Sequence, residues 1–154
     1  MRHTLALLLL SLLFLGCPTA GDDDDSSLSD DDDDDEDSWT TLRDGLDIRD
    51  LVVGEGDLVE EDDVITAHYT LWLWEDDALG NQIETSRPDN AFTAPLSIGS
   101  LIPGWVYGIP GMRVGGVREL IIASDLAYGD NEAGGGTIPG GSTLFFEVEI
   151  VGVQ

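Results

Sequence analysis

The chain has 154 residues, room for one domain, and its 32 acidic residues against 6 basic ones give a net charge of -26. Nucleic acid would be repelled by such a surface, so we expect no nucleic-acid partner. The single cysteine excludes a disulfide within the folded domain.

The N-terminus has the pattern of an export signal. Arg2 and His3 precede an apolar run over residues 5–15, which ends at Gly16 and Cys17. A basic start, an apolar core too short to span a bilayer and a small residue at its end are typical of a secretory signal. With the cysteine at the cleavage point, the segment resembles a bacterial lipoprotein signal, whose cysteine becomes the lipid-bearing N-terminus.

We therefore expect residues 1–16 to be a lipoprotein signal peptide and Cys17 to carry lipid. The protein would then be exported and held at the membrane of the cell envelope by its N-terminal lipid anchor. A plain signal peptide with an incidental cysteine is the alternative.

Residues 17–37 are predicted to be a disordered acidic tether. Within them, residues 22–37 hold twelve acidic residues and no basic one. Such a segment buries too little apolar surface to offset its ordering entropy, and its like charges keep it extended. A calcium site is the alternative, but no glycine interrupts the acidic run as a coordinating loop requires, and we predict no metal site.

The folded domain is predicted over residues 38–154, mostly as strands. We expect strands over 44–53, 64–74, 83–88, 117–123 and 143–151 and polar loops over 58–63 and 75–82. The last strand has the clearest alternation. Leu144, Phe146 and Val148 face one way while Glu147 and Glu149 face the other, which predicts a half-buried strand.

Only the stretch over residues 100–112 is predicted to be helical. Pro103 is tolerated in a first helical turn, Ser100 is a possible cap, and Pro110 with Gly111 ends the helix. Its apolar positions recur at three- and four-residue spacing: Ile102, Trp105, Val106 and Ile109. A short apolar helix among strands is best buried by a sheet that curls around it. The predicted fold class is therefore α+β, a curved antiparallel β-sheet wrapped around one short α-helix, with Trp105 at its centre.

Several short motifs resemble the FKBP-type peptidyl-prolyl cis–trans isomerases, in the family's order across residues 44–153. They are His68-Tyr69-Thr70, Glu84-Thr85-Ser86, Ile102-Pro103-Gly104-Trp105, Asp125-Leu126-Ala127-Tyr128-Gly129, Ile138-Pro139 and Phe145-Phe146-Glu147-Val148-Glu149. The resemblance implies the FKBP fold and an isomerase that accelerates rotation of Xaa-Pro bonds in exported or unfolded polypeptides. It implies no cofactor, and we expect a monomer.

The resemblance also implies a site. Trp105 would form the floor under the proline ring, and Tyr69, Leu101, Ile102 and Phe146 would be walls, with Ile83 and Ile138 also contacting substrate. The catalytic residues would be Tyr69, Glu84 and Tyr128. Tyr128 O–H and the backbone N–H of Ile102 would donate to substrate carbonyls, and Glu84 stands where the family usually has aspartate.

Departures from the family pattern leave other interpretations open. Ile83 replaces a common phenylalanine, Leu71 replaces a glycine, and Asp89 lies where an arginine often pairs with the acid, so that Glu84 could instead use Arg87. Taken singly, the aromatic residues would be core in any small β domain.

Two other functions are alternatives. The first is a non-catalytic FKBP-like peptide-binding or chaperone module anchored to the cell envelope. The second is an acidic surface spacer, in which Trp72 and Trp74 would be exposed. His68 is assigned no role, since strand alternation turns it away from Tyr69.

Overall fold

The computed structural model describes residues 38–154. The predicted signal peptide, the lipidation site Cys17 and the acidic tether lie outside the described residues. Within the described range, no helix combines the length and the apolar character needed to cross a membrane.

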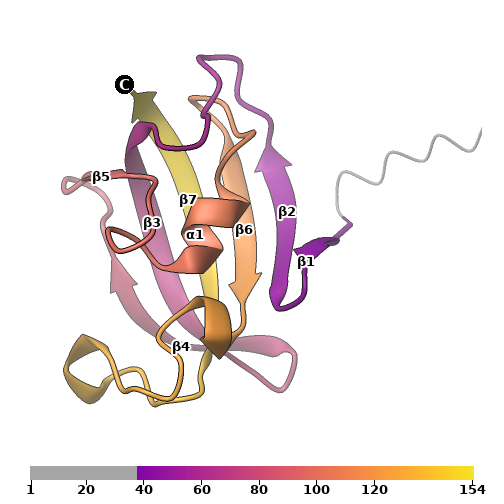
Figure 1. The fold of residues 1–154 in the computed structure, drawn as a ribbon, viewed down its shortest axis with the longest axis vertical. Coiled ribbons are helices and arrows are strands. Elements are labelled where there is room, and N and C mark those ends of the chain that lie inside the picture. Colours follow the sequence, from indigo (N-terminus) through magenta and orange to yellow (C-terminus); the bar gives the residue numbers. More distant parts are fainter. Residues whose placement is uncertain (1–37) are drawn as a thin grey trace, which may run out of the picture. The chain divides into compact units, whose positions relative to one another are not determined.

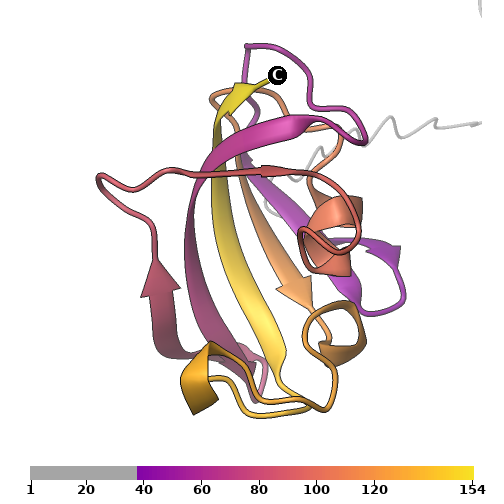
Figure 2. The same ribbon diagram turned by 60° about the vertical axis from the view of Figure 1, so that its left-hand side comes forward.

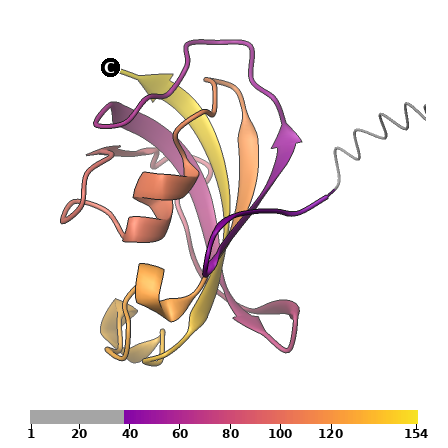
Figure 3. The same cartoon turned by 45° about the vertical axis from the view of Figure 1, so that its right-hand side comes forward.

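One antiparallel sheet of seven strands dominates the domain (Figure 1). Its strands are β1 (Thr40–Arg43), β2 (Leu46–Val52), β3 (Val64–Glu75), β4 (Ala78–Thr85), β5 (Phe92–Pro95), β6 (Val117–Ile122) and β7 (Thr143–Val153). The spatial order is β1-β2-β6-β7-β3-β4, and β5 pairs with residues 64–67 of β3, on the same edge of β3 as β4. The sheet curves, and the single α-helix, α1 (Pro103–Gly108), lies against its concave face (Figures 2 and 3). This arrangement confirms the predicted fold class.

The alternation predicted for the last strand accounts for the core. Leu144, Val148 and Ile150 of β7 are fully buried and Phe146 nearly so, beneath Trp105 and Ile109 of the helical segment. The connection from β6 to β7 contains two 3₁₀ turns, η1 (Ser124–Leu126) and η2 (Gly134–Gly136), at one end of the sheet.

The start of α1 differs from the predicted one. Pro103 is the first helical residue, as expected, but Ile102 holds the N-cap position and no side chain caps the helix. The Ser100 hydroxyl instead accepts a hydrogen bond from Ser97 Oγ at 3.2 Å. Ser100 as a helix cap was therefore wrong, because it belongs to the preceding turn.

The predicted loop over 75–82 was also wrong. β3 continues to Glu75 and β4 begins at Ala78, so the two strands form a hairpin. Its two turn residues, Asp76 and Asp77, have φ of 50° and 57°. Aspartate tolerates this left-handed conformation, and two such residues make the turn that suits the twist of a hairpin.

Strands β1 and β5 were not predicted from the sequence. Each has four residues, β1 is exposed throughout, and only Ala94 is buried in β5. Short edge strands of this kind carry almost no alternating pattern.

A second aromatic cluster covers the opposite face of the sheet. Trp72 meets Phe145 edge to face at 5.7 Å between ring centroids, Trp74 stacks on it at 5.5 Å, and Trp39 approaches it at 6.1 Å. Trp72 and Trp74 are therefore half-buried by packing on Phe145, which is 5 % exposed.

Two glycines let α1 lie very close to β6. A Cβ atom at Gly104 would overlap the side chain of Ile122, and one at Gly108 would overlap Leu120. Both isoleucine and leucine are completely buried, so neither has room to move aside.

A buried arginine fixes the end of the helix. Arg118 of β6 pairs with both carboxylate oxygens of Asp50, at 2.6 and 2.8 Å, and its third nitrogen donates to the carbonyl of Gly108 at 2.7 Å. The last helical carbonyl, which would otherwise lack a partner, is thereby tied to the sheet.

The close approach of α1 to β6 yields a stability prediction. Gly104→Ala should lower the free energy of unfolding by about 1–3 kcal/mol, measured by denaturant titration, because overpacking against Ile122 outweighs the better helix propensity of alanine. Gly104→Ala combined with Ile122→Ala should cost less than the sum of the two single changes. Strict additivity, or a stabilising Gly104→Ala, would contradict this packing.

Candidate functional site

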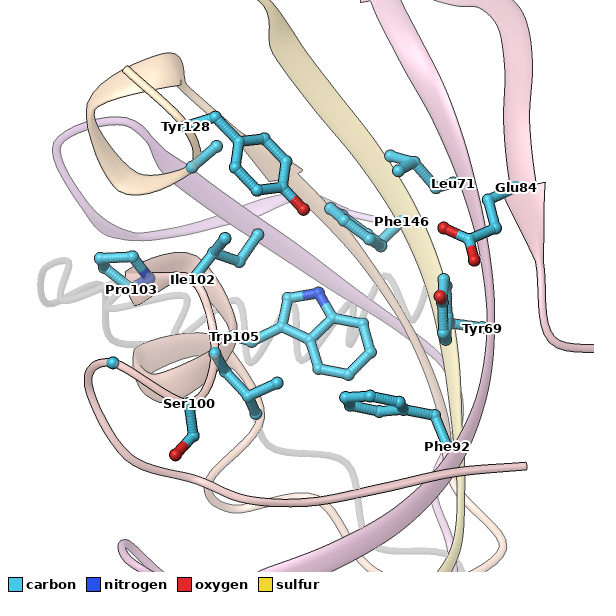
Figure 4. Close-up of a pocket in the computed structure, with 13 residues that line it drawn as sticks. Tyr69, Leu71, Glu84, Phe92, Ser100, Ile102, Pro103, Trp105, Tyr128 and Phe146 are labelled. Carbon is cyan, nitrogen blue, oxygen red and sulfur yellow. The ribbon is translucent and has the colours of Figure 1, made fainter. Parts of the chain in front are cut away.

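A cavity of about 450 Å³ opens between α1 and the concave face of the sheet (Figure 4). Its lining comes from β3, β4, β5, β7, the residues around the start of α1 and the turn after η1. The lining residues are Tyr69, Leu71, Glu84, Phe92, Gly99, Ser100, Leu101, Ile102, Pro103, Trp105, Ala127, Tyr128 and Phe146.

A change of strand partner on β3 creates one side of the cavity. Residues 64–67 of β3 pair with β5, whereas residues 70–75 pair with β4. Tyr69 lies at the break between them. Phe92 pairs opposite Ala67 and Glu84 opposite Leu71, and all of these share the concave face because they alternate with His68 and Thr70.

Ser86 holds the backbone at this break. The amide N–H of Tyr69 donates to Ser86 Oγ at 2.8 Å, and the amide of Ser86 donates to the carbonyl of Tyr69 at 2.9 Å. His68 Nδ1 lies 3.3 Å from the same hydroxyl. His68 therefore takes part in this anchoring network and is not among the residues that line the cavity.

Three aromatic rings surround the indole of Trp105. Tyr69, Phe92 and Phe146 lie at centroid distances of 5.5, 6.1 and 5.4 Å, each close to perpendicular to it. Edge-to-face contacts of this kind are favourable and define the orientation of a ring. Trp105 is 3 % exposed, and its indole N–H has no hydrogen-bond partner in residues 38–154. Because a buried donor normally has a partner, this one is available to an acceptor that enters the cavity.

The opposite wall is formed by Tyr128 and Ile102. Tyr128 follows η1 and is 40 % exposed, and Figure 4 shows its hydroxyl directed toward the space above Trp105. Ile102 lies at the N-cap of α1, so the short helix positions both its own Trp105 and this wall.

Glu84 is the one charged residue of the lining in the described chain. Burial, then the charge of Glu84 and a hydrogen bond to it, raises the pKa of Tyr69 from 10.0 to about 12. Burial and the charge of Glu84 also raise the pKa of Tyr128. Both phenols therefore remain protonated and able to donate a hydrogen bond well above neutral pH. No group of residues suited to hold a metal ion occurs within 38–154.

Most of the site residues predicted from sequence line this cavity. They are Tyr69, Glu84, Leu101, Ile102, Trp105, Tyr128 and Phe146. Ile83 and Ile138 are not among the lining residues. Ile83 is the extra residue of a β-bulge between Leu71 and Trp72 and packs on the core, and Ile138 is 3 % exposed within it.

Two further features of the site differ from the prediction made from the sequence. Arg87 does not serve Glu84, since its guanidinium donates to Glu149 at 2.7 Å and lies 3.9 Å from Glu147. Phe92 was missed as a cavity wall. The signal available for it was a lone aromatic residue in an otherwise polar stretch, alternating with Ala94 and Leu96, which are both buried.

Comparisons with known proteins relate this chain to the same family by its sequence and by its structure. The family model for FKBP-type peptidyl-prolyl cis–trans isomerases matches residues 56–151. The FK506-binding protein of Neisseria meningitidis serogroup B is 40 % identical over 109 residues, covering 71 % of this chain and 96 % of the relative.

Solved structures of the same family are also similar to this chain. The crystal structure of AtFKBP13 is 34 % identical with a TM-score of 0.65, covering 76 % of this chain and 99 % of that one. A peptidyl-prolyl cis–trans isomerase from Pseudomonas syringae pv. tomato is 28 % identical with a TM-score of 0.64, covering 75 % of this chain and 80 % of that one.

The raised pKa of Tyr69 predicts an unusual alkaline titration. In a tyrosinate absorbance titration, the difference between the unmodified protein and Tyr69→Phe should have its midpoint near pH 12, above the ordinary 10.0. Because the folded state holds this proton more tightly than the unfolded chain, its contribution to stability is complete below pH 10 and is lost as the pH rises toward 12. Glu84→Gln should lower the midpoint without restoring 10.0, since burial remains. A midpoint near 10 in protein that is still folded by circular dichroism would contradict this description of the site.

Proposed function

Because the chain belongs to the FKBP-type peptidyl-prolyl cis–trans isomerase family, we propose that the cavity over Trp105 is where it rotates Xaa-Pro bonds, and that it does so in exported or unfolded polypeptides. The chain is thus a peptidyl-prolyl cis–trans isomerase that binds proline-containing polypeptides.

The chemistry needs no covalent intermediate. Resonance keeps an amide planar and sets a rotation barrier of about 18–20 kcal/mol. A catalyst lowers this barrier if it binds the twisted amide more tightly than the planar one. Twisting removes resonance and leaves a less polar bond, so an apolar cavity that excludes water favours the twisted state.

The enclosed indole of Trp105 is the observation that most supports this function. Trp105 is almost fully buried and yet lines a cavity of about 450 Å³, with Tyr69, Phe92 and Phe146 around it. A proline ring would lie on the indole, and the surrounding rings would exclude water from the rotating bond. Tyr128 O–H and the backbone N–H of Ile102 would donate to the carbonyls of the peptide and fix them while the bond turns.

The predicted site of action follows from the N-terminal sequence. Arg2, the apolar run over 5–15 and Cys17 support export and a lipid anchor, and the twelve acidic residues of 22–37 support an extended spacer. A domain tethered in this way would meet polypeptides that fold after export, when their Xaa-Pro bonds are accessible. We expect it to work as a monomer.

Removal of one hydroxyl tests the assignment of Tyr128. Tyr128→Phe should lower kcat/KM for a Leu-Pro peptide about fivefold, the value of one hydrogen bond made in the transition state. Tyr107→Phe is the matched control, because Tyr107 is similarly exposed, at 44 %, and lies on α1 outside the lining. Equal activity of the two variants would remove Tyr128 from the mechanism, and binding of the peptide without any turnover would favour the non-catalytic module.

The lipid anchor has its own test. When the full chain is expressed in a bacterium that processes lipoproteins, it should fractionate with membranes, and intact mass should give a lipid adduct on a chain that begins at Cys17. Cys17→Ser should remove the adduct and release the protein from membranes. Membrane association that persists in Cys17→Ser, or an unmodified cysteine, would rule the anchor out.

A further inference from the structure

The carboxylate of Glu84 has no cationic partner in the described part of the chain. The sequence contains no lysine, and its six basic residues are all arginine. The five arginines within 38–154 each contact another group. Arg43 lies over the Tyr107 ring, Arg49 pairs with Glu119, Arg87 with Glu149, Arg113 with the Gly56 carbonyl and Arg118 with Asp50.

The charge of Glu84 reaches both sides of the cavity. Tyr69 lines one wall and Tyr128 the other, and the charge of Glu84 raises the pKa of both phenols. Neither phenol cancels the charge of Glu84, because both are neutral. An apolar cavity with one uncompensated negative charge is the result, and such a charge acts more strongly beside low-dielectric walls than in bulk water.

The segments around the cavity add further negative charge. Asp89 lies between β4 and β5, Asp125 precedes Tyr128, and Asp130 and Glu132 follow it; all four are exposed. The one arginine of these segments, Arg87, is already paired with Glu149. No described residue near the lining would therefore offset Glu84 for an approaching peptide.

We propose that Glu84 makes this isomerase selective for polypeptides that carry lysine or arginine next to the proline, and that it disfavours those with an acidic neighbour. The inference rests on the proposed function of the same cavity. With the proline ring on Trp105, the flanking side chains lie toward the rim, where the β4 edge places Glu84 (Figure 4). A long cationic side chain reaches the carboxylate while its methylene stem covers the aromatic wall.

The test compares peptides that differ in one charge. Two series of short peptides place lysine, norleucine or glutamate directly before or directly after the proline, and NMR exchange measurements with the full chain give kcat/KM for each. Norleucine is the matched neutral reference for the stem of lysine. In at least one series, kcat/KM of the lysine peptide should exceed that of the norleucine peptide about three- to tenfold at low salt. The norleucine peptide should in turn have a higher kcat/KM than the glutamate peptide. At about 1 M salt, where the Debye length is about 3 Å, the preference should largely disappear.

Within the Glu84→Gln variant, the ratio of kcat/KM for the lysine peptide to that for the norleucine peptide should fall to about one, a comparison in which any loss of overall rate cancels. Glu55→Gln removes the same charge from an exposed residue outside the lining and should leave the ratio unchanged. A ratio near one for the unmodified protein in both series, or a preference that survives Glu84→Gln, would overturn the inference and leave the isomerase function standing. Absence of turnover with every peptide would overturn the proposed function, and this inference with it.

Discussion

The close approach of α1 to β6 is the constraint on which the rest of the structure depends. Gly104 and Gly108 present no side chain to the sheet, so Ile122 and Leu120 of β6 lie directly against the helix. Arg118 then holds the end of the helix through the Gly108 carbonyl. In this position a helix of only six residues directs Trp105 along the concave face of the sheet, where Tyr69 of β3, Phe92 of β5 and Phe146 of β7 contact it.

The cavity exists because the sheet is interrupted opposite that indole. β3 pairs with β5 on one side of Tyr69 and with β4 on the other, and the chain between these two strands turns away through Ser86. A continuous strand would have placed another side chain over Trp105. The interruption instead leaves apolar walls with a single carboxylate, which combines a water-poor site for amide rotation with a charge that peptides of different sequence would experience differently.

The elements with a repeating apolar pattern could be predicted from the sequence, whereas the features set by the register of strand pairing could not. The alternation of Leu144, Phe146, Val148 and Ile150, and the proline and glycine that limit the helix, were enough for the fold class. Motifs matching a known family supplied most of the cavity lining. Phe92 could not be found in this way, because its place opposite Ala67 is set by long-range pairing of a four-residue strand. Similarly, the bulge that turns Ile83 to the core and the pairing of Arg87 with Glu149 depend on tertiary contacts that no local pattern encodes.

The most direct test of the central claim is to observe which indole a proline peptide meets. The four tryptophans lie on two faces, since Trp105 lines the cavity while Trp39, Trp72 and Trp74 surround Phe145 on the other side of the sheet. In a two-dimensional ¹H–¹⁵N NMR titration with a Leu-Pro peptide, assigned by single Trp→Phe variants, the Nε1–H signal of Trp105 should shift while the other three stay in place. Shifts confined to Trp72 and Trp74, with Trp105 unmoved at saturation, would contradict the account.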